Sequence, residues 1–268
     1  MLSYLRAVIF WINFIVITFV LFVWLVTVVG FCRLFRPSEL SKGAHWVATL
    51  WGRAIVLFTP GWRYRVLGKD KLPGPDEAPV VMVANHQSAA DIWALYLTGA
   101  QFRWLSKDAV FKVPIIGTAM RWAGYVPIKR GDRGSHGGAM QASARWLRQG
   151  VSMVFFPEGT RSEDGRLKEF KLGAFRLAMD EKVDILPLVL RGTRDMVQKK
   201  SGMPRPARLE IEVLSRVSPK PGESLESFGE RVREIIALRL EQGEAGAKPQ
   251  REASPELSRS NKPPISSY

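Results

Sequence analysis

The sequence predicts an α/β domain, with a sheet flanked by helices, that follows a hydrophobic N-terminal region. Two observations lead to this fold class. After Gly68, short apolar runs alternate with amphipathic segments of helical length. Before them, an apolar stretch without any charge reaches from Ala7 to Cys32. A chain of 268 residues is long enough for one such domain with an appendage, and too short for two. The expected division is an anchor region over 1–62, one domain over 63–242 and a disordered tail over 243–268, where composition shifts to Gly, Ala, Pro and Ser.

The apolar stretch over 7–32 is predicted to be a membrane-spanning helix. At about 1.5 Å per residue it would be roughly 39 Å long, more than the approximately 30 Å hydrocarbon core requires. A cleavable signal peptide does not fit, because its apolar part is typically about 7 to 15 residues. The single cysteine, Cys32, ends this stretch and leaves no disulfide framework and no CxxC metal or redox motif.

Basic residues are distributed unequally around the anchor. Arg6 precedes it, whereas Arg33, Arg36, Lys42 and Arg53 follow. The positive-inside bias therefore predicts that the domain lies on the cytoplasmic face of the membrane, which in a bacterium is the inner membrane.

A second apolar segment over 45–62 is expected to lie on the membrane or to dip into it. It is stopped by Pro60, and its tryptophans Trp46, Trp51 and Trp62 belong to the residue type that favours the headgroup level. The alternative is a core helix of the domain.

Within the domain, three apolar runs predict buried strands and one alternating run predicts a half-exposed strand. These runs are 80–84, 151–156, 185–190 and 209–214. Helices are expected near 89–97, 117–122, 138–149, 173–180 and 226–241.

Two polar clusters directly follow predicted buried strands. NHQSAAD, from Asn85 to Asp91, follows the first strand, and PEGTRS, from Pro157 to Ser162, follows the second. Ligands of open α/β sheets bind at the carboxyl ends of strands. We therefore expect both clusters to contribute to one pocket.

His86 and Asp91 form a candidate acid–base pair in the first cluster. In a continuous helix their side chains would point roughly 140° apart. Pairing therefore requires His86 in the turn before the helix, with Ser88 as N-cap and Asp91 in the first turn. The pair would then correspond to the His–Asp half of a hydrolase triad. A structural cap at a helix start is the alternative.

No protein nucleophile accompanies this pair. The sequence contains no G-x-S-x-G motif, and Cys32 lies in the membrane segment. The nucleophile is therefore predicted to be a substrate hydroxyl, from which His86 removes the proton as the oxygen attacks a thioester.

The second cluster has the residue types of a phosphate and hydroxyl site. Gly159 allows close backbone approach, Arg161 offers a planar fork for phosphate, and Glu158 can accept hydrogen bonds from hydroxyls. An ordinary turn with a solvated salt bridge would look similar.

Taken together, the motifs over 80–190 resemble those of the glycerolipid acyltransferases, typified by 1-acyl-glycerol-3-phosphate acyltransferase. NHQSAAD is similar to that family's N-H-x4-D block, and FPEGTRS to its F-P-E-G-T-R-S block. Lys107, VPIIG, GYVPIKR, FKLG and ILPLVL complete the family's order. Several ordered blocks are far more specific than any one of them.

The resemblance implies a mixed sheet flanked by helices and a dyad in which His86 is the general base and Asp91 orients it. It also implies that the glycerol phosphate acceptor is bound by Asn85, Lys107, Arg130, Glu158, Gly159, Thr160, Arg161 and Lys171. Two of these, Lys107 and Lys171, would equally fit solvated surface lysines. Lys129 departs from many family members, which have an acidic or amide residue there, and it adds positive charge near the phosphate site.

The expected reaction is acyl transfer from acyl-coenzyme A or acyl carrier protein to the sn-2 hydroxyl of 1-acyl-glycerol-3-phosphate, giving phosphatidate, with no metal or redox cofactor. One alternative keeps the chemistry with another acceptor, a lyso-ornithine lipid or a lysophospholipid. Another is a catalytically silent membrane protein that binds anionic lipid.

The net charge of +14, from 39 Lys plus Arg against 25 Asp plus Glu, suits an anionic partner. Anionic membrane lipids, coenzyme A phosphates and an acidic carrier protein fit it. Nucleic acid is not expected, because no basic run is interleaved with aromatic residues. The glycine-rich segment over 131–138 lacks the GxxxxGK[ST] pattern and is predicted to be a flexible loop.

Overall fold

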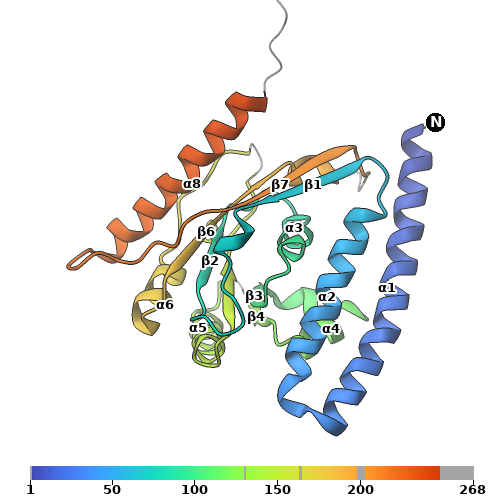
Figure 1. Ribbon diagram of the computed structural model, residues 1–268, viewed down its shortest axis with the longest axis horizontal. Helices are drawn as coiled ribbons and strands as arrows, with labels where there is room; N and C mark the ends of the chain where they lie inside the picture. Colours follow the sequence, from blue (N-terminus) through green and yellow to red (C-terminus); the bar gives the residue numbers. More distant parts are fainter. Residues whose placement is uncertain (1, 130, 163–164, 198–202, 248–268) are drawn as a thin grey trace, which may run out of the picture.

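A seven-stranded sheet with helices on both faces forms the body of the protein in a computed structural model, which describes residues 2–129, 131–162, 165–197 and 203–247 (Figure 1). The strands are β1 (Trp62–Leu67), β2 (Val81–Ala84), β3 (Phe102–Lys107), β4 (Val126–Ile128), β5 (Ser152–Phe155), β6 (Ile185–Arg191) and β7 (Ala207–Val213). The α-helices are α1 (Leu2–Phe35), α2 (Leu40–Leu57), α3 (Asp91–Thr98), α4 (Ile116–Trp122), α5 (Arg133–Arg148), α6 (Gly173–Glu181), α7 (Thr193–Met196) and α8 (Leu225–Ala247). Short 3-10 turns are η1 (Pro37–Glu39), η2 (Lys69–Lys71) and η3 (Asp108–Lys112).

The sheet is mixed, as the sequence implied. Its order is β1-β7-β6-β2-β5-β3-β4, and every neighbouring pair is parallel except β6 and β7. Strands β1 and β7 therefore run opposite to the other five. The central strands β2 and β5 are buried along their whole length, which explains why their sequences are continuously apolar rather than alternating.

The four predicted strands form β2, β5, β6 and β7, whereas β1, β3 and β4 were not predicted. β3 escaped detection because it contains Arg103, a charged residue that is fully buried. Its guanidinium donates to the carbonyl of Phe102 at 2.8 Å and to the hydroxyl of Ser41 at 3.2 Å. It also lies 4.9 Å from the centre of the Trp146 ring, where a cation is attracted to the π face. These contacts compensate for lost hydration.

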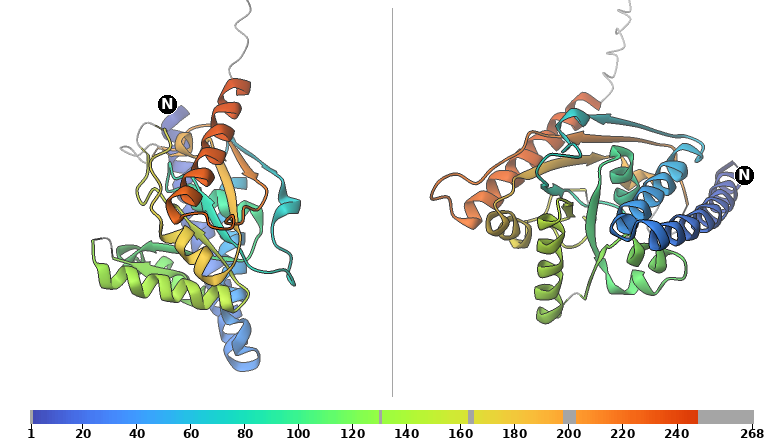
Figure 2. Two further views of the ribbon diagram at one scale, coloured as in Figure 1. Left: turned by 90° about the vertical axis from the view of Figure 1, so that its left-hand side faces the viewer. Right: turned by 60° about the horizontal axis from the view of Figure 1, so that its bottom comes forward.

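Two hydrophobic cores lie on opposite faces of the sheet. Helices α5, α6 and α8 cover one face, and α1 to α4 cover the other (Figures 1 and 2). Alternation along the central strands supplies both cores: Val81 and Val83 of β2 face one, and Met82 and Ala84 face the other.

Helices α1 and α2 form a hairpin that packs against the domain (Figure 1). By length and composition α1 could cross a membrane, and it extends beyond the predicted 7–32 at both ends. One face of it nevertheless belongs to the domain core, because Phe10, Leu25 and Val29 are buried. The amide of Asn13 also donates to the carbonyl of Phe58 at 3.0 Å.

The second apolar segment is mainly α2, whose buried residues pack against α3 and α4. Contact with α3 is so close that a Cβ at Gly52 would lie 2.4 Å from Tyr96 Cδ2. Of the three tryptophans expected at headgroup level, only Trp46 is exposed. Trp51 donates its indole N–H to the Thr18 hydroxyl, and Trp62 is buried at the start of β1. The alternative of a domain helix fits α2 better.

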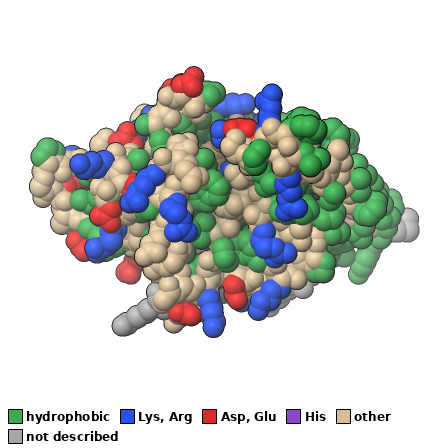
Figure 3. Space-filling model, turned by 90° about the horizontal axis from the view of Figure 1, so that it is seen from below, with side chains coloured by type: hydrophobic (Ala, Val, Ile, Leu, Met, Phe, Trp, Pro, Cys, Tyr) green, Lys and Arg blue, Asp and Glu red, His purple; other side chains and the backbone are tan. Residues whose placement is uncertain are grey.

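An apolar surface remains on the outer side of the hairpin. Figure 3 shows hydrophobic side chains gathered at the right-hand edge, where α1 lies in Figure 1. Its exposed large residues on α1 are Tyr4, Leu5, Val8, Ile9, Trp11, Ile12, Ile15, Val16, Phe19, Val20, Val23, Trp24, Val26, Phe31, Leu34 and Phe35. A patch of this extent on a protein surface marks a membrane or protein interface.

Two expectations about flexible segments need correction. The glycine-rich segment over 131–138 is not a loop throughout, because α5 begins at Arg133. Asp132 is its N-cap and accepts the backbone N–H of Ser135 at 3.1 Å. The predicted tail also begins too early, since α8 continues to Ala247; its remainder, 248–268, lies outside the described residues.

Candidate active site

The two polar clusters lie against one another at the carboxyl edge of the sheet. β2 and β5 are parallel neighbours, so the loops that follow them leave the same edge. The backbone N–H of Ser162 donates to the carbonyl of His86 at 2.9 Å, which joins the loops directly. β3, on the other side of β5, ends at Lys107 on that edge as well.

His86 and Asp91 are paired as the sequence predicted. His86 lies in the turn before α3, and its Nδ1 is 2.7 Å from Asp91 Oδ2. The same oxygen accepts the backbone N–H groups of Gln87 at 2.8 Å and Ser88 at 2.9 Å. Because Asp91 Oδ2 is buried and accepts from these backbone donors, it is fixed beside Nδ1 and holds the imidazole with its proton on that nitrogen. Nε2 is then free to accept a proton.

The predicted N-cap role of Ser88 is wrong. The residue before α3 is Ala90, and the Ser88 hydroxyl accepts the N–H of Ala90 at 3.2 Å. Asp91 does stand in the first helical turn, but its carboxylate bonds backward to the turn rather than forward to the helix.

Phe156 supports the His86 ring and was not recognised from the sequence. The two rings stack with centroids 4.2 Å apart and an interplanar angle of 22°. The contact joins residues that follow different strands, β2 and β5, so no local sequence pattern predicts it. Together with Asp91, it fixes both the position and the orientation of the imidazole.

Asn85 and Glu158, predicted to bind substrate, are both buried and engaged with the protein backbone. The Asn85 side chain donates to the Leu190 carbonyl at 2.9 Å and accepts the Leu190 N–H at 2.8 Å. It thereby continues the pairing of β2 with β6. Glu158 accepts the N–H groups of His86 at 2.7 Å and Lys168 at 3.2 Å. Burial raises the pKa of Glu158, and these hydrogen bonds partly offset that rise.

The predicted cationic residues meet at one cavity, apart from Arg130, which lies outside the described residues. Lys107, Arg161 and Lys171 line it together with His86. Gly159 has a φ of +70°, and a Cβ there would lie 2.8 Å from Lys171 Cε and Nζ. The glycine therefore permits both the turn and the passage of the lysine side chain.

This cavity has a volume of about 990 Å³ and opens beside the His86 ring. Its polar lining residues are His86, Ser106, Lys107, Asp132, His136, Thr160, Arg161 and Lys171. Asp132 and His136 were not predicted, because they belong to the segment interpreted as a loop. The remaining wall is largely apolar, with Trp51 of α2 and Trp93 and Trp104 among its aromatic residues. Val110 and Ile116, from the segment between β3 and α4 and the start of α4, add to this apolar wall.

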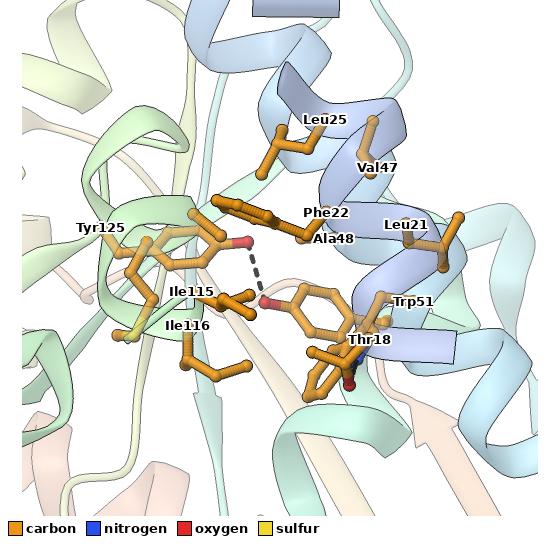
Figure 4. A pocket seen from close by; sticks show the side chains of 13 residues that line it. Thr18, Leu21, Phe22, Leu25, Val47, Ala48, Trp51, Ile115, Ile116 and Tyr125 are labelled. Carbon is orange, nitrogen blue, oxygen red and sulfur yellow. Dashed lines mark hydrogen bonds between the residues drawn. The ribbon is translucent and has the colours of Figure 1, made fainter. Parts of the chain in front are cut away.

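An apolar pocket of about 60 Å³ adjoins the cavity and shares Trp51, Tyr96, Ile116 and Met120 with it. Figure 4 shows it enclosed between α1, α2 and the segment around Ile115 and Tyr125. The hairpin is thus part of the wall rather than a detached anchor.

The side chains of His45, Tyr125 and Tyr96 form a buried hydrogen-bonded chain at the wall of this pocket. His45 Nε2 donates to the carbonyl of Ala100 at 3.0 Å, so Nδ1 accepts the Tyr125 hydroxyl at 2.9 Å. The Tyr96 hydroxyl in turn donates to Tyr125 at 2.8 Å, as drawn in Figure 4. Burial, followed by the charge of Arg103, lowers the pKa of His45 to about 3, while burial raises the pKa of Tyr96 to about 12. Burial also raises the pKa of Tyr125 well above its ordinary value, so all three side chains are neutral at physiological pH.

Comparisons with known proteins agree on one family. The family model described as "Acyltransferase" matches residues 63–191. A 1-acyl-sn-glycerol-3-phosphate acyltransferase of Chlamydomonas reinhardtii is 34% identical over 242 residues, which cover 90% of this chain and 71% of the relative. A chloroplastic enzyme of the same name from Arabidopsis thaliana is 42% identical over 163 residues, covering 61% of this chain and 45% of the relative.

A solved structure is also similar. The crystal structure of the 1-acyl-sn-glycerophosphate (LPA) acyltransferase PlsC from Thermotoga maritima aligns with a TM-score of 0.76 at 26% identity, covering 91% of this chain and 98% of that one. This chain spans only about half the length of the Arabidopsis relative and of a chloroplastic relative from Brassica napus.

Proposed function

Because the chain belongs to the 1-acyl-sn-glycerol-3-phosphate acyltransferase family, we propose that it transfers a fatty acyl group from a thioester donor to the sn-2 hydroxyl of 1-acyl-glycerol-3-phosphate, forming phosphatidate. The observation that carries the proposal is the His86–Asp91 pair, because His86 lines a cavity that Arg161 and Lys171 also line. A general base and a cationic group are what a phosphate-bearing alcohol requires.

In the proposed reaction, His86 Nε2 removes the proton of the acceptor hydroxyl while the oxygen attacks the thioester carbonyl. Asp91 stabilises the imidazolium through the Nδ1–H hydrogen bond. The C–O bond forms, the C–S bond breaks, and the departing thiolate takes the proton from His86. Acyl-coenzyme A and acyl carrier protein both supply the required thioester, and no further cofactor enters the balance.

Lys107, Arg161 and Lys171 are the described cations proposed to hold the acceptor phosphate. Arg161 offers bidentate hydrogen bonding, whereas the lysines act as point charges. Thr160 adds a hydroxyl to the same wall. The apolar part of the cavity and the pocket beside it suit hydrocarbon chains, whose burial is favourable.

We further propose that α1 lies along the membrane surface instead of crossing the bilayer. Phe10 and Val29, both packed against the domain, are about 28 Å apart at about 1.5 Å per residue, close to the whole thickness of a hydrocarbon core of roughly 30 Å. A crossing helix would pull the domain surface into lipid. The exposed apolar face of α1 would instead enter one leaflet, with the domain on the cytoplasmic side and the basic residues near anionic headgroups.

Cysteine accessibility tests this arrangement. Single cysteines at Arg6 and Arg36, in a Cys32→Ser background, should react with a membrane-impermeant maleimide from the same side of sealed vesicles. Labelling from opposite sides would support a crossing helix and contradict the proposal.

Acyl transfer by membranes that contain the full chain tests the reaction. Radiolabelled acyl-coenzyme A and acyl carrier protein are each offered with lysophosphatidate, a lyso-ornithine lipid and lysophospholipids. We expect lysophosphatidate to be acylated best, and His86→Ala to lower the rate by about 10²-fold or more through loss of the general base. Preference for another acceptor would change the assigned substrate. Absence of transfer with every pair would favour a silent lipid-binding protein.

A further inference from the structure

Glu158 differs from its neighbours in the loop after β5. Pro157, Gly159, Thr160 and Arg161 all line the cavity, whereas Glu158 is not among the described residues that do so. Only 5% of Glu158 is exposed. Its side chain points into the protein between two loops, away from where an acceptor would bind.

Both carboxylate oxygens of Glu158 already have donors. Oε1 accepts the N–H of His86 at 2.7 Å, and Oε2 accepts the N–H of Lys168 at 3.2 Å. Neither donor belongs to a substrate. A carboxylate is also a poor partner for a phosphate, because like charges repel.

The backbone of His86 is consequently held at both its N–H and its C=O by the same loop. Its N–H donates to Glu158, and its carbonyl accepts the N–H of Ser162 at 2.9 Å. Arg161, which faces the cavity, lies between these two residues in sequence. The base and the cation proposed for the phosphate therefore belong to one rigid unit.

We propose that Glu158 is a positioning residue, which sets His86 at the correct distance from the acceptor hydroxyl and does not contact the acceptor itself. The proposal rests on acyl transfer as the reaction, and it assigns Glu158 a role different from the substrate binding that the family resemblance implies. A carboxylate suits this role, because each of its two oxygens accepts one of the two backbone N–H groups.

Glu158→Gln is the direct test, because it preserves size but replaces one acceptor oxygen with an NH2 group. One of the two backbone N–H groups, that of His86 or that of Lys168, then faces a donor, which weakens the contact that positions His86. Misplacement by about 1 Å can reduce a rate by about 10²-fold. We therefore expect kcat with lysophosphatidate to fall by about 10- to 100-fold, with KM within about threefold of wild type.

Arg161→Gln is the matched comparison, since it alters a residue of the same loop that faces the cavity. It should raise the KM for lysophosphatidate more than it lowers kcat. If Glu158→Gln behaves in the same way, or leaves both constants unchanged, the proposal is overturned. Glu158→Asp keeps the charge with a shorter reach and should recover part of the lost kcat. Should the Gln variant not fold, the kcat and KM of the Asp variant decide by the same criterion.

Hydrogen exchange in the full-length protein separates this inference from the proposed reaction. Peptides that contain 85–91 should exchange faster in Glu158→Gln than in wild type, whether or not any acceptor is turned over. If exchange is faster in Glu158→Gln but the wild-type protein transfers no acyl group, the proposed reaction is refuted while the positioning of His86 by Glu158 is supported. If exchange is unchanged in Glu158→Gln, the positioning role is refuted.

Discussion

Replacing Asp91 by asparagine removes the negative charge beside His86 while preserving the size of the side chain. In the wild-type protein the imidazolium forms beside this charge, because His86 Nδ1 lies 2.7 Å from Asp91 Oδ2 and Asp91 is fully buried. Two opposite unit charges about 4 Å apart attract by about 4 kcal/mol at an effective dielectric constant near 20. Since about 1.4 kcal/mol corresponds to a tenfold change in rate, we expect kcat to fall by about 10³-fold.

The assay follows thiol release from acyl-coenzyme A at saturating lysophosphatidate, or from the acyl carrier protein if that is the active donor. Asp132→Asn is the control, because Asp132 lines the same cavity and the substitution removes the same charge. Asparagine caps helices about as well as aspartate, so this variant should remain within about threefold of wild type. Thermal unfolding checks that both variants fold. A folded Asp91→Asn variant that retains more than about a tenth of the wild-type kcat would refute the reasoning.

Three further predictions concern packing, backbone and pH. Gly52→Ala should lower the thermal midpoint, at a cost of about 1–3 kcal/mol, because its Cβ would lie 2.4 Å from Tyr96 Cδ2; Gly30→Ala, with nothing within 4 Å, should not. Gly159→Ala should lower kcat/KM, since a φ of +70° costs an alanine about 1–2 kcal/mol; an unchanged value would show that the turn tolerates a Cβ. The pKa of His45 is lowered from 6.5 to about 3, so between these values only the unfolded chain takes up a proton. The free energy of unfolding therefore decreases as the pH is lowered below 6.5. From pH 6.5 to 5 the free energy of unfolding should drop by about 2 kcal/mol more in wild type than in His45→Asn, as unfolding titrations can measure.

The central strands were predictable because burial on both faces leaves a continuous apolar run, as in β2 and β5. β3 was not predictable in this way, because an arginine in a sequence normally indicates an exposed position. Arg103 is buried because the fold places the Trp146 ring and the Ser41 hydroxyl beside its guanidinium. The same applies to α5. Its glycines each cost about 1 kcal/mol in a helix, and packing of the later residues overrides that local preference.

In the candidate site, the His86–Asp91 pair was predictable because five residues and one turn bring its members together. Leu190 lies 105 residues from Asn85, and His86 lies 72 residues from Glu158, so these hydrogen bonds depend on the order of strands in the sheet. Sequence could identify these residues as polar and adjacent to a strand end. It could not distinguish a side chain that faces the cavity from one that holds a neighbouring backbone.

The pairing of the first strand with the last has a consequence for how the chain acquires its structure. Arg65 on β1 and Glu210 on β7 interact although 145 residues separate them. At about 5–20 residues per second, a ribosome needs roughly 7–30 s to synthesise that interval. β1 therefore exists for many seconds before β7, the strand that pairs with it. Throughout that time the backbone N–H and C=O groups of β1 lack this partner strand, and such an unpaired strand edge is a site at which a nascent chain can aggregate.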